Sequence, residues 1–240
     1  MKRIISVLIC SFFVLSACKS THRVAISGQE YLVNYKAIVL TGFSMPDALE
    51  YRTDIRDYYA SKVTDIFESR GIKVFDESLY FDEFEKQKAL AGGYIDEYTG
   101  KVDTDKRNQI RQKTLQSLRA THGIDSVLFY DLRRRTAHFG DYRAQWDGQE
   151  EPYELSNSDL TNFLSTLVAN TSGKIPALSL MVFMEDMDGK ELYMGAGGVQ
   201  LVAKLNDDDE FESIPVDKLL RDEAKLDFSV EEAFRKLFND

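Results

Sequence analysis

One apolar run constrains the fold of this chain more than any other feature. Residues 175–184 are interrupted only by Pro176 and Ser179, and a strand that is apolar on both faces is typical of the covered centre of a sheet. An Asp188-Gly189 turn separates this run from a second apolar segment, 191–205, and Asp-Gly favours a tight hairpin. The sequence therefore predicts a long C-terminal β-hairpin within a sheet that is covered on both sides.

The preceding segments alternate between strand and helix patterns. Strands are predicted at 35–41, 73–75 and 126–132, and helices at 52–70, 82–91, 105–122 and 159–170, with Gly71 and Gly123 as helix stops. Ser229 and Glu232 have the spacing of a capping box, which predicts the start of a last helix. We expect an α/β fold, with α+β as the alternative: a single layered mixed sheet with helices on both faces, formed by one domain over residues 35–240.

The N-terminus has the pattern of an export signal. Lys2 and Arg3 precede an apolar stretch, 4–15, which is too short to span a membrane as a helix. The stretch ends in Leu15-Ser16-Ala17-Cys18, which resembles the lipobox of bacterial lipoproteins. This resemblance implies removal of a signal peptide, 1–17, and covalent attachment of diacylglycerol and acyl lipid such as palmitate to Cys18.

The segment after Cys18 predicts how close the domain lies to its membrane. Residues 18–34 are expected to be the lipidated cysteine and a short tether, without a Pro-rich or Gly/Ser-rich stalk. Lys19 stands where aspartate would favour retention in the inner membrane, so the lipoprotein pattern implies the inner leaflet of the outer membrane, facing the periplasm. Cys10 and Cys18 are the only cysteines, and the predicted mature chain therefore has no pair for a disulfide.

The net charge of the chain limits the partners that it can bind. The formal charge is −10, and removal of Lys2 and Arg3 with the signal peptide makes it −12. Such a chain is repelled by nucleic acid and by anionic lipid headgroups, so we expect no nucleic-acid partner and attachment to the membrane through the lipid anchor alone. The sequence leaves the oligomeric state open.

The order of elements resembles a family of periplasmic lipoproteins. The resemblance rests on the lipobox, on Arg70-Gly71-Ile72-Lys73-Val74, on the junction 121–128 (THGIDSVL), and on Asp188-Gly189-Lys190-Glu191-Leu192 in the hairpin. It is to the domain shared by curli-secretion-channel-like proteins, by lipoprotein activators of penicillin-binding proteins, and by the amino-terminal domain of the Tol-system periplasmic protein. This resemblance implies a non-catalytic role in an envelope protein assembly.

The segment 133–154 is the candidate site for a partner, because it is expected to be a long loop without secondary structure, and such loops are commonly functional. It combines the residue types that dominate interface hot spots. The alternative is that Trp146 folds back and covers the edge of the sheet. The candidate partner-binding residues are Arg133, Arg134, Arg135, Phe139, Tyr142, Trp146 and Tyr153.

Other chemistry has less support in the sequence. His22, His122 and His138 lack zinc-ligand spacing, so neither a metal nor a cofactor beyond the lipid is expected. The glycines of 195–198 indicate a bulge or a close backbone approach rather than phosphate binding, and the acidic run 207–210 fits a solvated turn better than a calcium site. We expect a lipid-anchored accessory or scaffold protein. The alternatives are a lipid- or glycan-binding auxiliary of a transport system and, more remotely, an envelope hydrolase.

Overall fold

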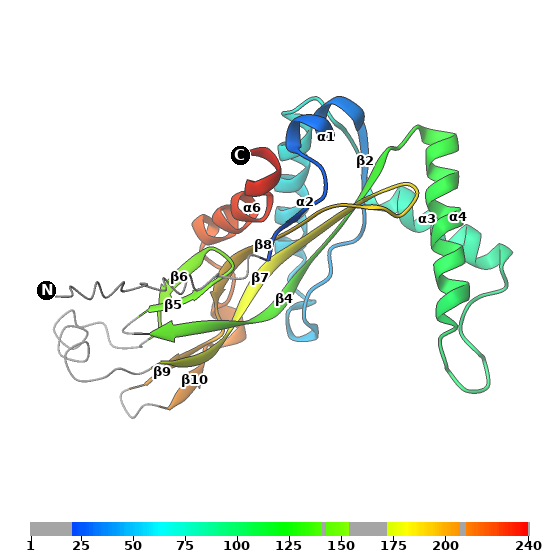
Figure 1. The fold of residues 1–240 in the computed structure, drawn as a ribbon. Helices are drawn as coiled ribbons and strands as arrows, with labels where there is room; N and C mark the ends of the chain where they lie inside the picture. The colour runs from blue at the N-terminus through cyan, green and yellow to red at the C-terminus, as the bar shows by residue number, and fades with distance from the viewer. Residues whose placement is uncertain (1–20, 141–142, 154–171, 207–209, 240) are drawn as a thin grey trace, which may run out of the picture.

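The computed structural model describes residues 21–140, 143–153, 172–206 and 210–239. Its main element is a mixed sheet with the strand order β1-β8-β7-β4-β2-β3, in which β2 runs parallel to β3 and to β4 (Figure 1). A hairpin, β5–β6, continues from the far end of β4, and β9 pairs with β10. The strands are β1 (Arg23–Val24), β2 (Ala37–Leu40), β3 (Lys73–Phe75), β4 (Ser126–Gly140), β5 (Arg143–Trp146), β6 (Gln149–Pro152), β7 (Gly173–Asp186), β8 (Glu191–Leu201), β9 (Ala203–Leu205) and β10 (Phe211–Ser213).

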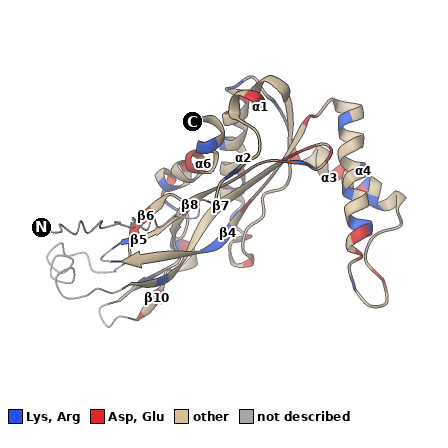
Figure 2. Ribbon diagram, in the orientation of Figure 1, with Lys and Arg blue, Asp and Glu red and all other residues tan. Residues whose placement is uncertain are grey.

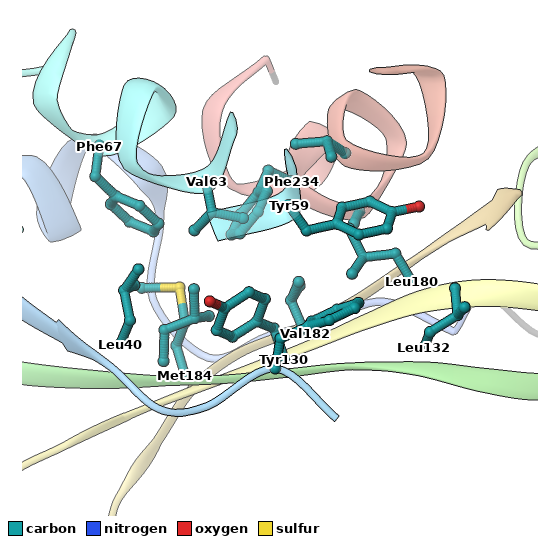
Figure 3. Packing of buried hydrophobic residues seen from close by; sticks show 14 of the residues in the cluster. Leu40, Tyr59, Val63, Phe67, Tyr130, Leu132, Leu180, Val182, Met184 and Phe234 are labelled. Atoms are coloured by element: carbon teal, nitrogen blue, oxygen red, sulfur yellow. The ribbon is translucent and has the colours of Figure 1, made fainter. Parts of the chain in front are cut away.

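Helices cover both faces of this sheet, as the sequence predicted. On one face lie α1 (Gly28–Asn34), α2 (Thr53–Glu68) and α6 (Glu223–Phe238), and on the other lie α3 (Glu77–Leu90) and α4 (Thr104–His122) (Figure 1). Alternation along β4 separates the two cores, because Leu128 and Tyr130 belong to the first and Val127 to the second. Figure 3 shows the first core, where Tyr59 and Phe67 of α2 and Phe234 of α6 face side chains of β2, β4 and β7.

The predicted hairpin is present. Strand β7 pairs with β8 from Ala177↔Leu201 to Glu185↔Glu191, and the backbone N–H of Gly189 donates to the carbonyl of Asp186 (3.0 Å). Strand β7 also pairs with β4 along fourteen positions, from Ser126↔Asp186 to Phe139↔Gly173. The apolar run is therefore central and has a strand on each side.

Glycines allow α6 to lie directly on β8. A Cβ at Gly195 would stand 1.9 Å from the carbonyl oxygen of Ala233, and one at Gly197 would stand 1.9 Å from that of Ser229. The prediction of a close backbone approach at 195–198 is therefore confirmed.

Three predictions about local structure are wrong. The segment 133–154 is not a long loop, because β4 continues to Gly140 and β5 and β6 follow. The tether does not reach residue 34, because β1 pairs with β8 and α1 buries Tyr31. The last helix does not begin at Ser229: the side chain of Asp222 caps it, accepting from the N–H of Ala224 (3.1 Å), and Ser229 lies in mid-helix.

Some expectations fall outside the described residues. These are the signal peptide, the lipobox with Cys18, the amphipathic helix at 159–170 and most of the acidic run 207–210. Among the residues that are described, no helix combines the length and the apolar character needed to cross a membrane.

Candidate protein-interaction site

The predicted arginine cluster is divided by the pleat of β4. Arg133 and Arg135 share the face that is covered farther along by α3 and α4, whereas Arg134 lines a hollow on the opposite face beside Leu49 and Leu178. Arg133 forms a two-pronged ion pair with Asp131, at 2.6–2.8 Å. The three arginines therefore do not form a single patch.

The predicted aromatic residues belong to a core rather than to a surface. Phe139, Trp146 and Tyr153 pack in a third cluster beneath the β5–β6 hairpin, where Trp146 is 6% exposed and Tyr153 is 2% exposed. The indole N–H of Trp146 donates to the carbonyl of Leu178 on β7 (3.1 Å). This is the alternative in which Trp146 folds back onto the sheet. Tyr142 lies outside the described residues.

A groove crosses the uncovered part of the sheet, between α4 and β1. We call it the sheet groove, and its volume is about 440 Å³. Its floor is apolar, with Phe129, Met181, Phe183 and Met194 from β4, β7 and β8. Three arginines line it, and each has an acidic partner: Arg23 pairs with Glu191, Arg111 with the buried Glu185, and Arg133 with Asp131.

Exposed apolar side chains are most frequent in a different segment, α3 and the α3–α4 loop, which was not among the predicted binding residues. Ten large hydrophobic side chains are exposed in the described part of the chain, and five of them lie on α3 or on the loop between α3 and α4. Tyr98 is 97% exposed and Leu90 is 76% exposed; Ile95 and Val102 are about half exposed. We call these four residues the apolar tip. Figure 1 shows the α3–α4 loop protruding from the end of the molecule opposite the β5–β6 hairpin.

The backbone of the apolar tip is held by hydrogen bonds. Ile95 and Val102 form an antiparallel bridge, and the N–H of Asp96 donates to the carbonyl of Lys101 (2.9 Å). The carboxylate of Asp96 accepts from the N–H of Tyr98 (3.0 Å) and from that of Thr99 (2.7 Å). The bonds from Thr99 hold the pKa of Asp96 below its ordinary value. Tyr98 is thus presented on a turn that is already ordered, which lowers the entropic cost of binding.

The helix beside the apolar tip is basic in an acidic chain. Helix α4 carries five Lys or Arg residues and one Asp, against a net charge of −10 for the whole sequence. Figure 2 shows basic positions distributed along α4. Two of these basic residues pair with Glu185 and Asp188, and the α3–α4 loop carries three acidic residues, Asp96, Glu97 and Asp103, so the charge around the apolar tip is mixed. The tip is therefore complementary to an apolar pocket on a partner, and charge does not specify the rim of that pocket.

His22 and His138 line one hollow beside the β5–β6 hairpin, and His122 lies apart from them. His122 is at the end of α4 against the ring of Phe75, His138 is on β4, and a ring nitrogen of His22 contacts the carbonyl of Glu232 (3.0 Å). Within the described ranges, no group of three or more His, Cys, Asp or Glu residues could hold a metal ion.

Comparison with known proteins gives little. No protein-family model and no curated protein matches the sequence. Among solved structures, the chain is similar to a neuraminyllactose-binding hemagglutinin homolog from Helicobacter pylori, with 11% identity and a TM-score of 0.32 over 83% of this chain and 81% of the other. A similarity at this level carries no argument about function.

Proposed function

We propose that this chain is a non-catalytic, lipid-anchored accessory protein of the bacterial envelope that acts through protein–protein contact at the apolar tip. The observation that carries the proposal is the near-complete exposure of Tyr98 on a hydrogen-bonded turn, in a loop that also exposes Ile95 and Val102 and that follows the exposed Leu90 at the end of α3. Tyrosine is enriched among residues that dominate binding energy, and exposed apolar clusters mark interaction sites. The occupant is an envelope protein with an apolar pocket that accepts Tyr98.

The lipid anchor is supported by the signal pattern and by Cys18. The test is the intact mass of the protein purified from membranes, with Cys18→Ser as the control. We expect the wild-type protein to lack residues 1–17 and to carry acyl mass on Cys18. We expect the variant, in which cleavage cannot follow acylation, to carry no acyl mass and to keep residues 1–17. An unmodified cysteine in membrane-purified protein would refute the anchor.

The contact at the apolar tip is tested by photo-crosslinking in cells. A benzophenone amino acid replaces Tyr98, and the control replaces Tyr51, a tyrosine that is also largely exposed (61%) but lies outside the tip. We expect one envelope protein to be captured from position 98 and not from position 51. Capture that is equal at the two positions, or absent from both in a correctly localised protein, would contradict the proposal.

A second candidate function rests on the sheet groove. Its apolar floor suits the hydrocarbon chain of an amphiphile, and its rim of paired arginines and carboxylates suits a polar head, which supports a lipid-binding auxiliary of a transport system. Mass spectrometry of an organic extract from residues 19–240, made without the signal peptide and Cys18, tests this candidate. We expect a bound amphiphile that is lost in Phe183→Arg, and its absence from the protein with Phe183 would remove the candidate.

A further inference from the structure

The first described residues are attached to the domain by contacts with two elements, β8 and α6. β1 pairs with β8 at Arg23↔Met194 and Val24↔Tyr193, and the N–H of Ala25 donates to the carbonyl of Leu192 (3.1 Å). His22 contacts the carbonyl of Glu232 on α6. The segment 21–25 is therefore part of the fold.

Asp147, in the turn between β5 and β6, holds the beginning of this segment. Its carboxylate is 5% exposed and accepts hydrogen bonds from Thr21 (2.6 Å), Ser179 (2.7 Å) and Arg135 (3.0 Å). Its backbone carbonyl accepts from the N–H of Gly198 on β8 (2.8 Å). We call Thr21, Arg135, Asp147 and Ser179 the anchor clamp.

The anchor clamp limits the distance between the domain and a membrane. Cys18 and Thr21 are three residues apart, which is at most about 10 Å of fully extended chain. A lipid on Cys18 therefore brings the surface around Thr21 close to the headgroups. This surface, which we call the anchor face, surrounds a hollow of about 790 Å³ lined by residues that include His22, Arg135, Asp147, Glu232 and Arg235.

Charge does not explain contact between the anchor face and a bilayer. Arg135 pairs with Asp147 and Arg235 with Glu232, and Glu150 adds a further acid to the lining. The face therefore lacks the excess of Lys and Arg that attracts anionic lipid. Its orientation toward the membrane must come from the attachment point.

We infer that the anchor clamp fixes the domain in one orientation, with the anchor face against the bilayer and the α3–α4 end directed away from it. This inference rests on the proposed lipidation of Cys18. It places the apolar tip at the membrane-distal end, since Figure 1 shows α3 and α4 at the opposite end of the sheet from β5 and β6.

The test is energy transfer between the protein and the bilayer. The lipoprotein is purified in detergent, its acyl mass is confirmed, and it is reconstituted in phosphatidylcholine vesicles that carry a headgroup-labelled acceptor lipid. A donor dye is placed through Gln145→Cys on β5 or through Glu97→Cys in the α3–α4 loop, both exposed positions. Because Cys10 leaves with the signal peptide and Cys18 is acylated, the introduced thiol is the only one that reacts.

We expect more transfer from Gln145→Cys than from Glu97→Cys. A flexible linker of about 20 Gly and Ser residues, inserted between Ser20 and Thr21, adds a mean reach of about 25 Å and should abolish the difference without altering the domain. Thr21→Val, which removes one hydrogen bond of the anchor clamp, should reduce the difference. Equal transfer from both positions in the acylated protein would overturn the orientation alone, whereas absence of acyl mass on Cys18 would refute the anchor and the orientation together.

Discussion

Asp147 connects parts of the chain that are distant in sequence, and its charge is essential to that role. Burial opposes its ionisation, but hydrogen bonds from Arg135, Thr21 and Ser179 outweigh this effect and lower the pKa of Asp147. A carboxyl whose pKa is lower in the folded chain than in the unfolded chain stabilises the fold above about pH 4. That contribution is lost as the pH falls through the pKa of the folded state.

Asp147→Asn should therefore destabilise the protein in a pH-dependent manner. Asparagine tolerates the positive φ of this position (37°) but lacks the charge, and we expect a loss of about 1–3 kcal/mol at neutral pH. The difference between the variant and the wild type should shrink as the pH falls below about 4. Urea unfolding at several pH values measures it. The control is Asp188→Asn, which breaks an exposed pair with Arg119 and should cost little; equal losses in the two variants would contradict the prediction.

The effect of substituting Gly197 follows from the short distance between its backbone and the backbone of α6. Gly197→Ala would place a methyl group against the carbonyl of Ser229, so that α6 must shift from β8, at a cost of about 1–3 kcal/mol or more. Thermal unfolding measures the loss. Gly140→Ala is the matched control, because nothing lies within 4 Å of the added Cβ. A Gly197→Ala protein as stable as the control would contradict the close packing of α6.

At the scale of elements, the β5–β6 hairpin depends on Trp146, the only tryptophan of the chain. Its side chain fills the third core and hydrogen-bonds to β7. Trp146→Ala should destabilise the protein by about 3–5 kcal/mol. Chemical unfolding followed by circular dichroism measures this loss, with Phe211→Ala on the exposed β10 as the control. An unchanged unfolding midpoint would show that Trp146 does not stabilise the core and would favour the prediction that it binds a partner.

The regular elements were predictable because their local signals agree with their burial. The helices α2 and α4, the strand β3 and the β7–β8 turn follow from apolar spacing and from glycine. The far half of β4 was missed because arginines occupy both of its faces and mask its alternation. Two signals were present. A strand as long as β7 requires a neighbour of similar length. Asp147-Gly148 is also an Asp-Gly turn signal, like Asp188-Gly189, and both Asp147 and Gly148 have a positive φ.

The candidate site was less predictable than the fold. Hot-spot composition selected Trp146 and Tyr153, but composition alone does not distinguish an exposed aromatic residue from a core residue. Tyr98 lies in a segment without helical or strand periodicity. The available signal for the apolar tip was the presence of apolar residues that fit neither a helical nor a strand period. Their exposure to solvent could be established only from the structure.

At the scale of the whole molecule, the negative net charge predicts attachment to a membrane through the lipid and not through electrostatic attraction. Residues 19–240, made without the signal peptide and Cys18, have a formal charge of −12, because Lys2 and Arg3 are absent from the total of −10, and should not bind vesicles rich in anionic phospholipid, even at low ionic strength. The acylated protein should remain bound at high salt, because its attachment is hydrophobic. Vesicle flotation at two salt concentrations measures both. Binding of residues 19–240 that salt reverses would show an electrostatic membrane site.

The position of β1 in the sheet has a consequence for biogenesis. The partners of the segment 21–25 all lie late in the chain, at Asp147, on β8 and at Glu232. The segment cannot complete these contacts until Glu232 has been synthesised, and contacts between residues so distant in sequence form slowly. Under the proposed anchoring, the enzymes that acylate and cleave the precursor therefore meet a segment that has no partners yet. Under this proposal, acylation and cleavage precede the docking of the segment 21–25 onto the folded domain.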